Sequence, residues 1–98
     1  MAHRVAPEAE SDLDEIWYYV AEESGSIETA DRLIDSITDR FFLLARSPYI
    51  GRSRDDLGPG YRGFPVETYL IIYCLEGGDV LVLRVVHGRR ELGALFDH

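Results

Sequence analysis

The chain has 98 residues, of which 46% are hydrophobic and 11% aromatic, and its formal net charge is −8. This composition is too apolar for a disordered chain, and the length predicts a single domain, residues 1–98, with one modest core. No apolar run approaches the roughly 20 residues of a membrane span, and the N-terminus has no apolar signal segment, so we expect a cytoplasmic protein that does not enter a membrane.

The excess negative charge lies entirely in the first half. Residues 1–45 contain three arginines and eleven acidic residues (3 − 11 = −8), whereas residues 46–98 contain seven of each. An acidic protein repels the nucleic-acid backbone, which argues against tight direct DNA binding. All cations are arginines, whose planar guanidinium pairs with carboxylate or phosphate, so any phosphate contact should be local.

A short strand is expected at residues 2–6, followed by a helix that begins at Pro7, where the missing N–H costs nothing. Apolar residues recur at three- and four-residue steps and form one stripe, whereas the acidic residues of this helix, Asp12 among them, are expected on a solvated face. The segment Ser24-Gly25-Ser26 ends the helix, and Ser26 can cap a second one.

The second helix continues to Ser47-Pro48 and carries more apolar residues than one sheet face needs. The surplus predicts a docking surface for a partner segment, or alternatively a cover for the sheet edge. The residues concerned are Phe41, Phe42, Leu43 and Leu44.

Glycine, proline and charge predict a loop over residues 49–60, and three strands should follow at residues 61–66, 69–75 and 80–87. The last two strands are joined by Gly77-Gly78, as in a tight hairpin. The sequence therefore predicts an α+β fold of order βααβββ, with a helical hairpin on one face of a largely antiparallel four-stranded sheet.

Cations gather where the last strand ends. We expect them to form one surface together with the arginines of the long loop, rather than separate salt bridges, since a twelve-residue loop can reach about 40 Å. Residues 84 and 87 lie on opposite faces of a regular strand unless a bulge intervenes. The predicted anion- or target-binding residues are Arg52, Arg54, Arg84, His87, Arg89 and Arg90.

Neither a metal site nor a nucleophile is expected. The single cysteine, Cys74, lies in an apolar strand, which favours a buried, inert thiol. His3, His87 and His98 are scattered, without other ligands at metal-binding spacing. No cofactor motif occurs, so we predict no cofactor.

The chain resembles the RelE/ParE toxin superfamily, and more closely its ParE branch, the plasmid-stabilisation toxins. Four pieces carry the resemblance over nearly the whole chain: Val5-x-Pro7-x-Ala9-x-x-Asp12-Leu13-x-x-Ile16, Gly51-Arg52-x-Arg54-x-x-Leu57, Tyr61-Arg62-x-Phe64-Pro65-Val66 with Tyr69-Leu70-Ile71-Ile72-Tyr73, and Leu83-Arg84-Val85-Val86-His87-Gly88-Arg89-Arg90. The resemblance implies the toxin of a type II toxin–antitoxin pair, held inactive by a ParD-like antitoxin whose C-terminal segment wraps it.

Three functions remain open. ParE-like members are held to poison DNA gyrase by binding alone. RelE-like members cleave messenger RNA on the ribosome without a metal, which requires a cation for the phosphorane and groups that move protons. Here Arg62 and Arg84 would supply the charge, and His87 or Glu67 the proton transfer, but the last eight residues contain no tyrosine. The third is a non-toxic binding scaffold of this fold.

Overall fold

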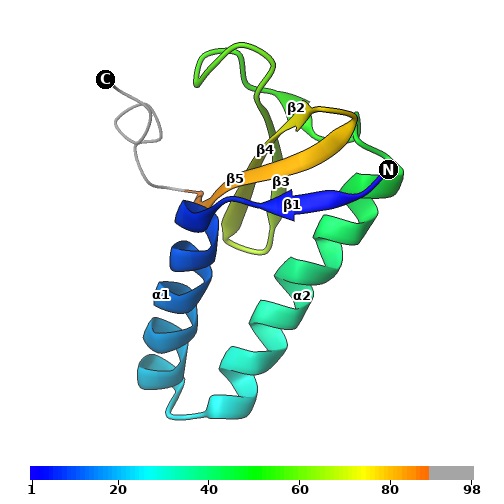
Figure 1. Cartoon of the computed structure of the whole chain (residues 1–98). Helices are drawn as coiled ribbons and strands as arrows, with labels where there is room; N and C mark the ends of the chain where they lie inside the picture. Colours follow the sequence, from blue (N-terminus) through cyan, green and yellow to red (C-terminus); the bar gives the residue numbers. More distant parts are fainter. Residues whose placement is uncertain (89–98) are drawn as a thin grey trace.

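The computed structural model describes residues 1–88, in which two helices form a hairpin against one face of a five-stranded sheet (Figure 1). The helices are α1 (Pro7–Ser24) and α2 (Ile27–Arg46), and the strands are β1 (His3–Val5), β2 (Arg52–Ser53), β3 (Arg62–Val66), β4 (Tyr69–Glu76) and β5 (Asp79–His87). The order across the sheet is β1-β5-β4-β3-β2, in which β1 and β5 are parallel and the other pairs antiparallel. The α+β class and the helical hairpin are confirmed.

The sheet has five strands instead of the predicted four, because part of the expected loop pairs with β3. Arg52 lies opposite Gly63, and Ser53 lies opposite Arg62. Two residues are too few to show a strand periodicity, so composition alone assigned residues 49–60 to a loop. The short β2 places Arg52 at an edge of the sheet, with Arg54 directly after the strand.

The helix ends follow local signals in the sequence. Pro7 is the first residue of α1, and Gly25 ends it with a φ of 67°, a left-handed conformation that suits glycine. The Ser26 hydroxyl caps α2 by accepting a hydrogen bond of 3.1 Å from the Thr29 N–H. Near this turn, Trp17 Nε1 donates to Asp31 Oδ1 at 2.7 Å, so an indole and a carboxylate join the two helices.

The main core lies between the helices and the sheet. Ala9 and Ile16 from α1 and Ile37, Phe41 and Leu44 from α2 pack against the inward side chains of the strands. A smaller cluster on the other face of the sheet contains Leu57, Ile72 and Val86. Leu57 belongs to the loop between β2 and β3, so this loop covers part of the face that the helices leave open.

None of the helices in residues 1–88 is long and apolar enough to cross a membrane.

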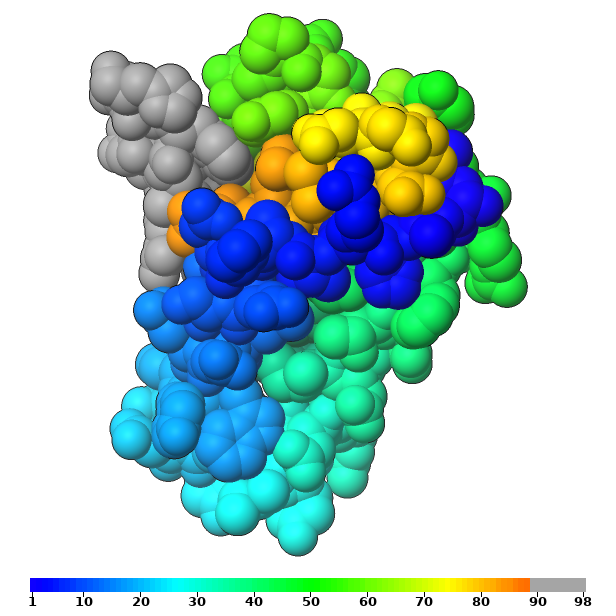
Figure 2. Space-filling model, viewed as in Figure 1, coloured from blue at the N-terminus to red at the C-terminus, as the bar shows by residue number. Residues whose placement is uncertain are grey.

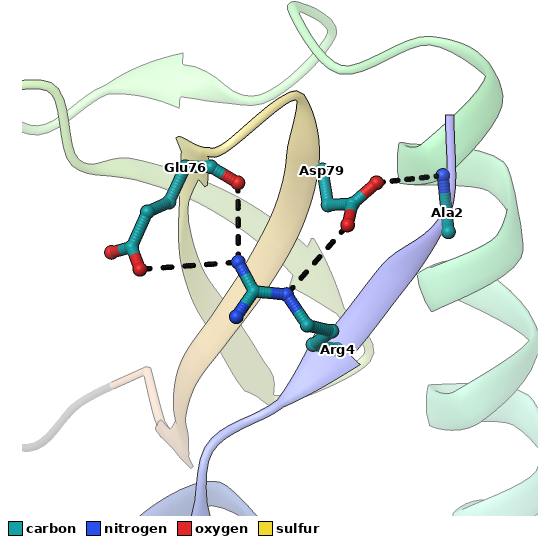
Figure 3. A network of polar contacts seen from close by, with 4 residues as sticks. All are labelled: Ala2, Arg4, Glu76 and Asp79. Carbon is teal, nitrogen blue, oxygen red and sulfur yellow. Dashed lines mark hydrogen bonds and ion pairs between the residues drawn. The ribbon is translucent and has the colours of Figure 1, made fainter.

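The edge strand β1 is fastened to the turn of the β4–β5 hairpin (Figures 2 and 3). Arg4 Nη2 donates to the Glu76 carbonyl at 3.1 Å, and the Arg4 guanidinium also lies 3.9 Å from the Glu76 carboxylate and 3.7 Å from that of Asp79. Ala2 N donates to Asp79 Oδ1 at 3.3 Å. Arg4 and Glu76 are exposed and Asp79 is half-buried, so each ion pair contributes at most about 1 kcal/mol. Together they hold the N-terminal strand in register with β5.

Candidate functional site

A carboxylate closes the edge of β5 where β1 stops. The pairing of β1 with β5 ends at Val82, and the next residues of β5 face the first turns of α1 (Figure 1). There the Asp12 carboxylate accepts hydrogen bonds from Arg84 Nε at 2.7 Å, from Arg84 Nη2 at 2.9 Å and from the Val85 N–H at 2.9 Å. A strand N–H without a strand partner is therefore satisfied by a helix side chain.

The Arg84 guanidinium uses two of its nitrogen donors, Nε and Nη2, to bind the Asp12 carboxylate. The hydrogen bond with this carboxylate is the main reason why the pKa of Arg84 is raised. The Arg84 side chain is only 22% exposed and that of Asp12 only 10%. The prediction that Asp12 belongs to a solvated face is wrong, because it lies three residues after the buried Ala9 and four before the buried Ile16, on the inward side of the helix. That spacing was the signal that could have identified it.

A cavity of about 450 Å³, which we term the α1–β5 cavity, lies beside this contact. Tyr69 and His87 face each other across β4 and β5, with ring centroids 5.6 Å apart in an edge-on arrangement. Burial is the main cause that raises the pKa of Tyr69. Within residues 1–88, the lining combines acidic, aromatic and apolar side chains without an arginine: Asp12, Glu15, Ile16, Tyr19, Thr68, Tyr69, Val85, Val86 and His87.

A second cavity, of about 390 Å³, lies at the opposite edge of the sheet and is termed the β2–β3 cavity. As far as the described residues go, its lining contains two arginines and no acid: Ile50, Arg52, Arg54, Gly63, Phe64, Pro65 and Leu70. Arg54 donates through Nε and Nη2 to the two carboxylate oxygens of Asp56, at 3.0 and 2.9 Å, which raises the pKa of Arg54 and lowers that of Asp56. The Arg52 side chain is exposed and has no hydrogen bond or ion pair with any other residue in the range 1–88.

The predicted single surface of cations is therefore divided. The expectation that these residues avoid separate salt bridges is wrong for Arg54 and Arg84, which pair with Asp56 and Asp12. Arg52 and Arg84 lie in one row across the sheet, through Gly63 and Ile72, but three strand spacings separate them, roughly 14 Å. Arg89 and Arg90 lie outside the described residues.

His87 and Arg84 do not converge. The ladder between β4 and β5 is irregular where Ile72 pairs with Arg84 and Tyr73 with Val82, which leaves Leu83 as the extra residue. This irregularity precedes both residues, so it does not change their relative alternation. His87 lines the α1–β5 cavity, whereas the Arg84 side chain does not.

Arg62 and Tyr73 fix the segment that follows α2. Tyr73 OH donates to the Pro48 carbonyl at 2.8 Å and accepts from the Gly51 N–H at 3.0 Å. Arg62 Nη1 donates to the Gly51 carbonyl at 2.7 Å, and its guanidinium lies 4.9 Å from the centre of the Tyr49 ring. A Cβ at position 51 would come within 2.7 Å of Tyr73 Cε1, so the close approach requires glycine.

The four apolar residues near the end of α2 separate into two pairs. Phe41 and Leu44, only 2% and 0% exposed, belong to the core and cannot receive a partner on the folded protein, which corrects their assignment to a docking surface. They continue the inward stripe of Ile37, at steps of three and four residues. Phe42 is 63% exposed, Leu43 is half-buried, and the Phe42 ring lies edge-on to His3 with centroids 4.7 Å apart.

The chemistry of the remaining candidates is limited. Cys74 is half-buried, and burial raises the pKa of its thiol, which keeps the thiol in its less reactive protonated form. In residues 1–88, no three His, Cys, Asp or Glu side chains are grouped as a metal ion would require. The described part of the chain has two cavities, one with acidic residues in its lining and one with arginines, and an exposed phenylalanine, Phe42, on α2.

Comparison with known proteins gives a consistent result. Residues 4–92 match the family model described as the ParE toxin of the type II toxin–antitoxin system parDE. The chain is 39% identical over 83 residues to Toxin ParE3 of Caulobacter vibrioides, covering 85% of this chain and 82% of that protein. It is 29% identical over 89 residues to Toxin ParE1 of Mycobacterium tuberculosis, covering 90% of each chain. A solved structure titled "Chromosomal ParDE TA system from P. aeruginosa" shares the fold with a TM-score of 0.78 and 22% identity, over 89% of this chain and 95% of that one.

Proposed function

The chain belongs to the ParE family and is a toxin of a type II toxin–antitoxin system, and on that premise we propose that a cognate ParD-like antitoxin neutralises it and that it inhibits DNA gyrase by binding, without catalysis. Gyrase is the target that the resemblance to the ParE branch implies. We propose that the toxin binds the antitoxin and gyrase in the cytoplasm and that neither contact requires a cofactor.

The non-catalytic proposal rests on one observation: the two candidate catalytic arginines, Arg62 and Arg84, are both hydrogen-bonded within the protein. Metal-independent RNA cleavage needs a cation that is available to the phosphorane. Arg84 donates twice to Asp12, and Arg62 donates to the Gly51 carbonyl and stacks on Tyr49. Releasing either guanidinium would leave buried or half-buried polar groups unpaired, at a cost of about 1–3 kcal/mol each. Both arginines are thus better suited to holding the fold than to binding phosphate.

Target binding is assigned to the β2–β3 cavity. Of the other predicted target-binding residues, His87 lines the α1–β5 cavity instead, and Arg89 and Arg90, which lie outside the described residues, stay predictions. The exposed Arg52 side chain has no polar partner in residues 1–88, and Arg54, which pairs with Asp56, lines the same cavity together with the apolar Leu70 and Pro65. A guanidinium above an apolar surface is a common composition for the centre of a protein interface.

Antitoxin binding is assigned to Phe42 and Leu43, the two of the four apolar residues near the end of α2 that are not buried in the core. An aromatic ring that is 63% exposed near the end of a helix provides an apolar anchor, and the open edge of β1 lies close by, at His3. A helix laid along α2, an added strand, or both would cover this patch.

Two assays on the purified toxin test the proposal. We expect inhibition of gyrase supercoiling, relieved by the co-expressed antitoxin, and no cleavage of ribosome-bound messenger. Site-specific cleavage of the messenger that is lost in His87→Ala would instead establish a ribonuclease. A toxin that binds the antitoxin but impairs neither process would be a scaffold without toxicity.

A further inference from the structure

The α1–β5 cavity has the composition of a receptor for a basic side chain, and we propose that it receives an arginine or lysine of the antitoxin. This inference rests on the proposed function, because it adds a second contact to the partner that the toxin requires. The cavity is separate from the Phe42 patch on α2, to which antitoxin binding is already assigned.

The charge in the cavity comes from Glu15. Its carboxylate is exposed at the cavity wall and has no hydrogen bond or ion pair with any other residue in the range 1–88, and its charge contributes only a minor part of the rise in the pKa of Arg84. The other acid of the lining, Asp12, is already satisfied by Arg84 and Val85, so it contributes little free charge. Glu15 is therefore the carboxylate that an incoming cation would meet, within a first half of the chain that carries the whole net charge of −8.

The rest of the lining suits the stem and the edge of a basic side chain. The Tyr19 ring is 61% exposed at the rim, and the Tyr69 ring is fixed edge-on to His87, so two aromatic rings line the cavity close to a carboxylate. Cations bind such faces favourably. Ile16, Val85 and Val86 supply apolar surface for the aliphatic stem that arginine and lysine bury. A volume of about 450 Å³ holds one such side chain with room for water.

The choice of the antitoxin over the target follows from the sign of the two cavities. Among residues 1–88, the lining of the β2–β3 cavity has two arginines and no acid, and that of the α1–β5 cavity has two acids and no arginine. The first cavity lies at the β2 edge of the sheet and the second between α1 and the ends of β4 and β5, so a partner surface whose charge complements one cavity does not complement the other. Since the arginine cavity is assigned to the target, the acidic cavity is left for the antitoxin.

The first experiment uses a probe for the side chain itself. N-acetyl-arginine amide is titrated into isotope-labelled toxin, and N-acetyl-citrulline amide, which has the same shape without the charge, is the matched probe. We expect amide shifts near Tyr69 and Val86 with arginine only, with binding weakened roughly 3- to 10-fold in Glu15→Gln and unchanged in Glu22→Gln, an exposed acid of α1 outside the cavity. Equal shifts with citrulline, or wild-type binding by Glu15→Gln, would overturn the site.

The second experiment tests the occupant with the toxin–antitoxin complex. Glu15→Gln should speed the dissociation of the antitoxin at low salt by a similar factor and leave gyrase inhibition unchanged. If antitoxin dissociation is unaltered while gyrase binding weakens, the cavity belongs to the target and the assignment is wrong. If the wild-type toxin bound neither the antitoxin nor gyrase, the proposed function itself would be wrong. If only the role of the α1–β5 cavity were wrong, the wild-type toxin would still bind the antitoxin.

Discussion

Asp12 in α1 holds Arg84 in β5 through hydrogen bonds of 2.7 and 2.9 Å, although the two residues are 72 positions apart in the sequence. The same carboxylate accepts the Val85 N–H at 2.9 Å. Because β1 ends before it reaches Val85, the Asp12 carboxylate accepts the hydrogen bond that a longer β1 strand would accept. The same side chain joins the helical hairpin to the sheet beside the α1–β5 cavity.

Asp12→Ala should destabilise the toxin by about 3 kcal/mol, because it leaves a guanidinium that is only 22% exposed and a buried strand N–H without partners. Urea unfolding measures the change. Arg84→Ala should lower the stability by a similar amount, since it leaves the buried Asp12 carboxylate without its charged partner. The double variant should cost less than the sum of the two, and strict additivity would contradict the coupling.

Arg52→Ala should reduce growth inhibition and gyrase inhibition with a change in the free energy of unfolding of less than about 0.5 kcal/mol, because Arg52 is exposed and has no polar partner in residues 1–88. Arg32→Ala, an exposed arginine of α2, is the matched control. Arg84→Ala is not a valid toxicity test by itself, since lost stability would also lower toxicity. Full toxicity of Arg52→Ala would remove the β2–β3 cavity from the target surface.

Phe42→Ser should weaken antitoxin binding about tenfold or more and leave stability nearly unchanged, since the ring is 63% exposed in the free toxin. Binding is measured by calorimetry. Ile27→Ser, at the other end of α2 and 58% exposed, serves as the control. By contrast, Phe41→Ala should cost about 3–5 kcal/mol of stability, because that side chain lies in the core.

Tyr73→Phe should lower stability by about 1–2 kcal/mol at neutral pH, because the Pro48 carbonyl and the Gly51 N–H lose their partner. Its pH dependence should also change. Burial raises the pKa of Tyr73 above its ordinary value of 10.0 in the folded protein. Above about pH 10 the unfolded chain therefore releases a proton that the folded chain retains, so stability falls as the pH rises, and it is unaffected below that pH.

Unfolding in urea between about pH 8 and pH 11 measures this slope. Tyr73→Phe should flatten it, and the remainder should come in part from Tyr69, whose pKa is also raised by burial. Tyr18→Phe, which removes the hydroxyl of an exposed tyrosine, should leave the slope unchanged. An equal slope in wild type and Tyr73→Phe would show that Tyr73 is accessible to solvent.

Local signals in the sequence determined most of the fold. Pro7, Gly25 and the Ser26 cap defined the two helices, because helix ends depend on backbone conformation and on hydrogen bonds within a few residues. Gly77 and Gly78, with φ of 61° and 82°, defined the β4–β5 turn for the same reason. The family resemblance also came from the sequence, since it rests on spacing along the chain.

Only the tertiary structure decided which side chains are available to partners. Arg84 and Arg52 are both arginines of the second half, but one is held by Asp12 and the other has no polar partner in residues 1–88. Phe41 and Phe42 are neighbours, and a rotation of about 100° per helical residue separates the core from the solvent. Helical spacing could have placed Phe41 inside, but the pairing across 72 positions and the different charges of the two cavities depend on how the elements pack, and no local pattern encodes that packing.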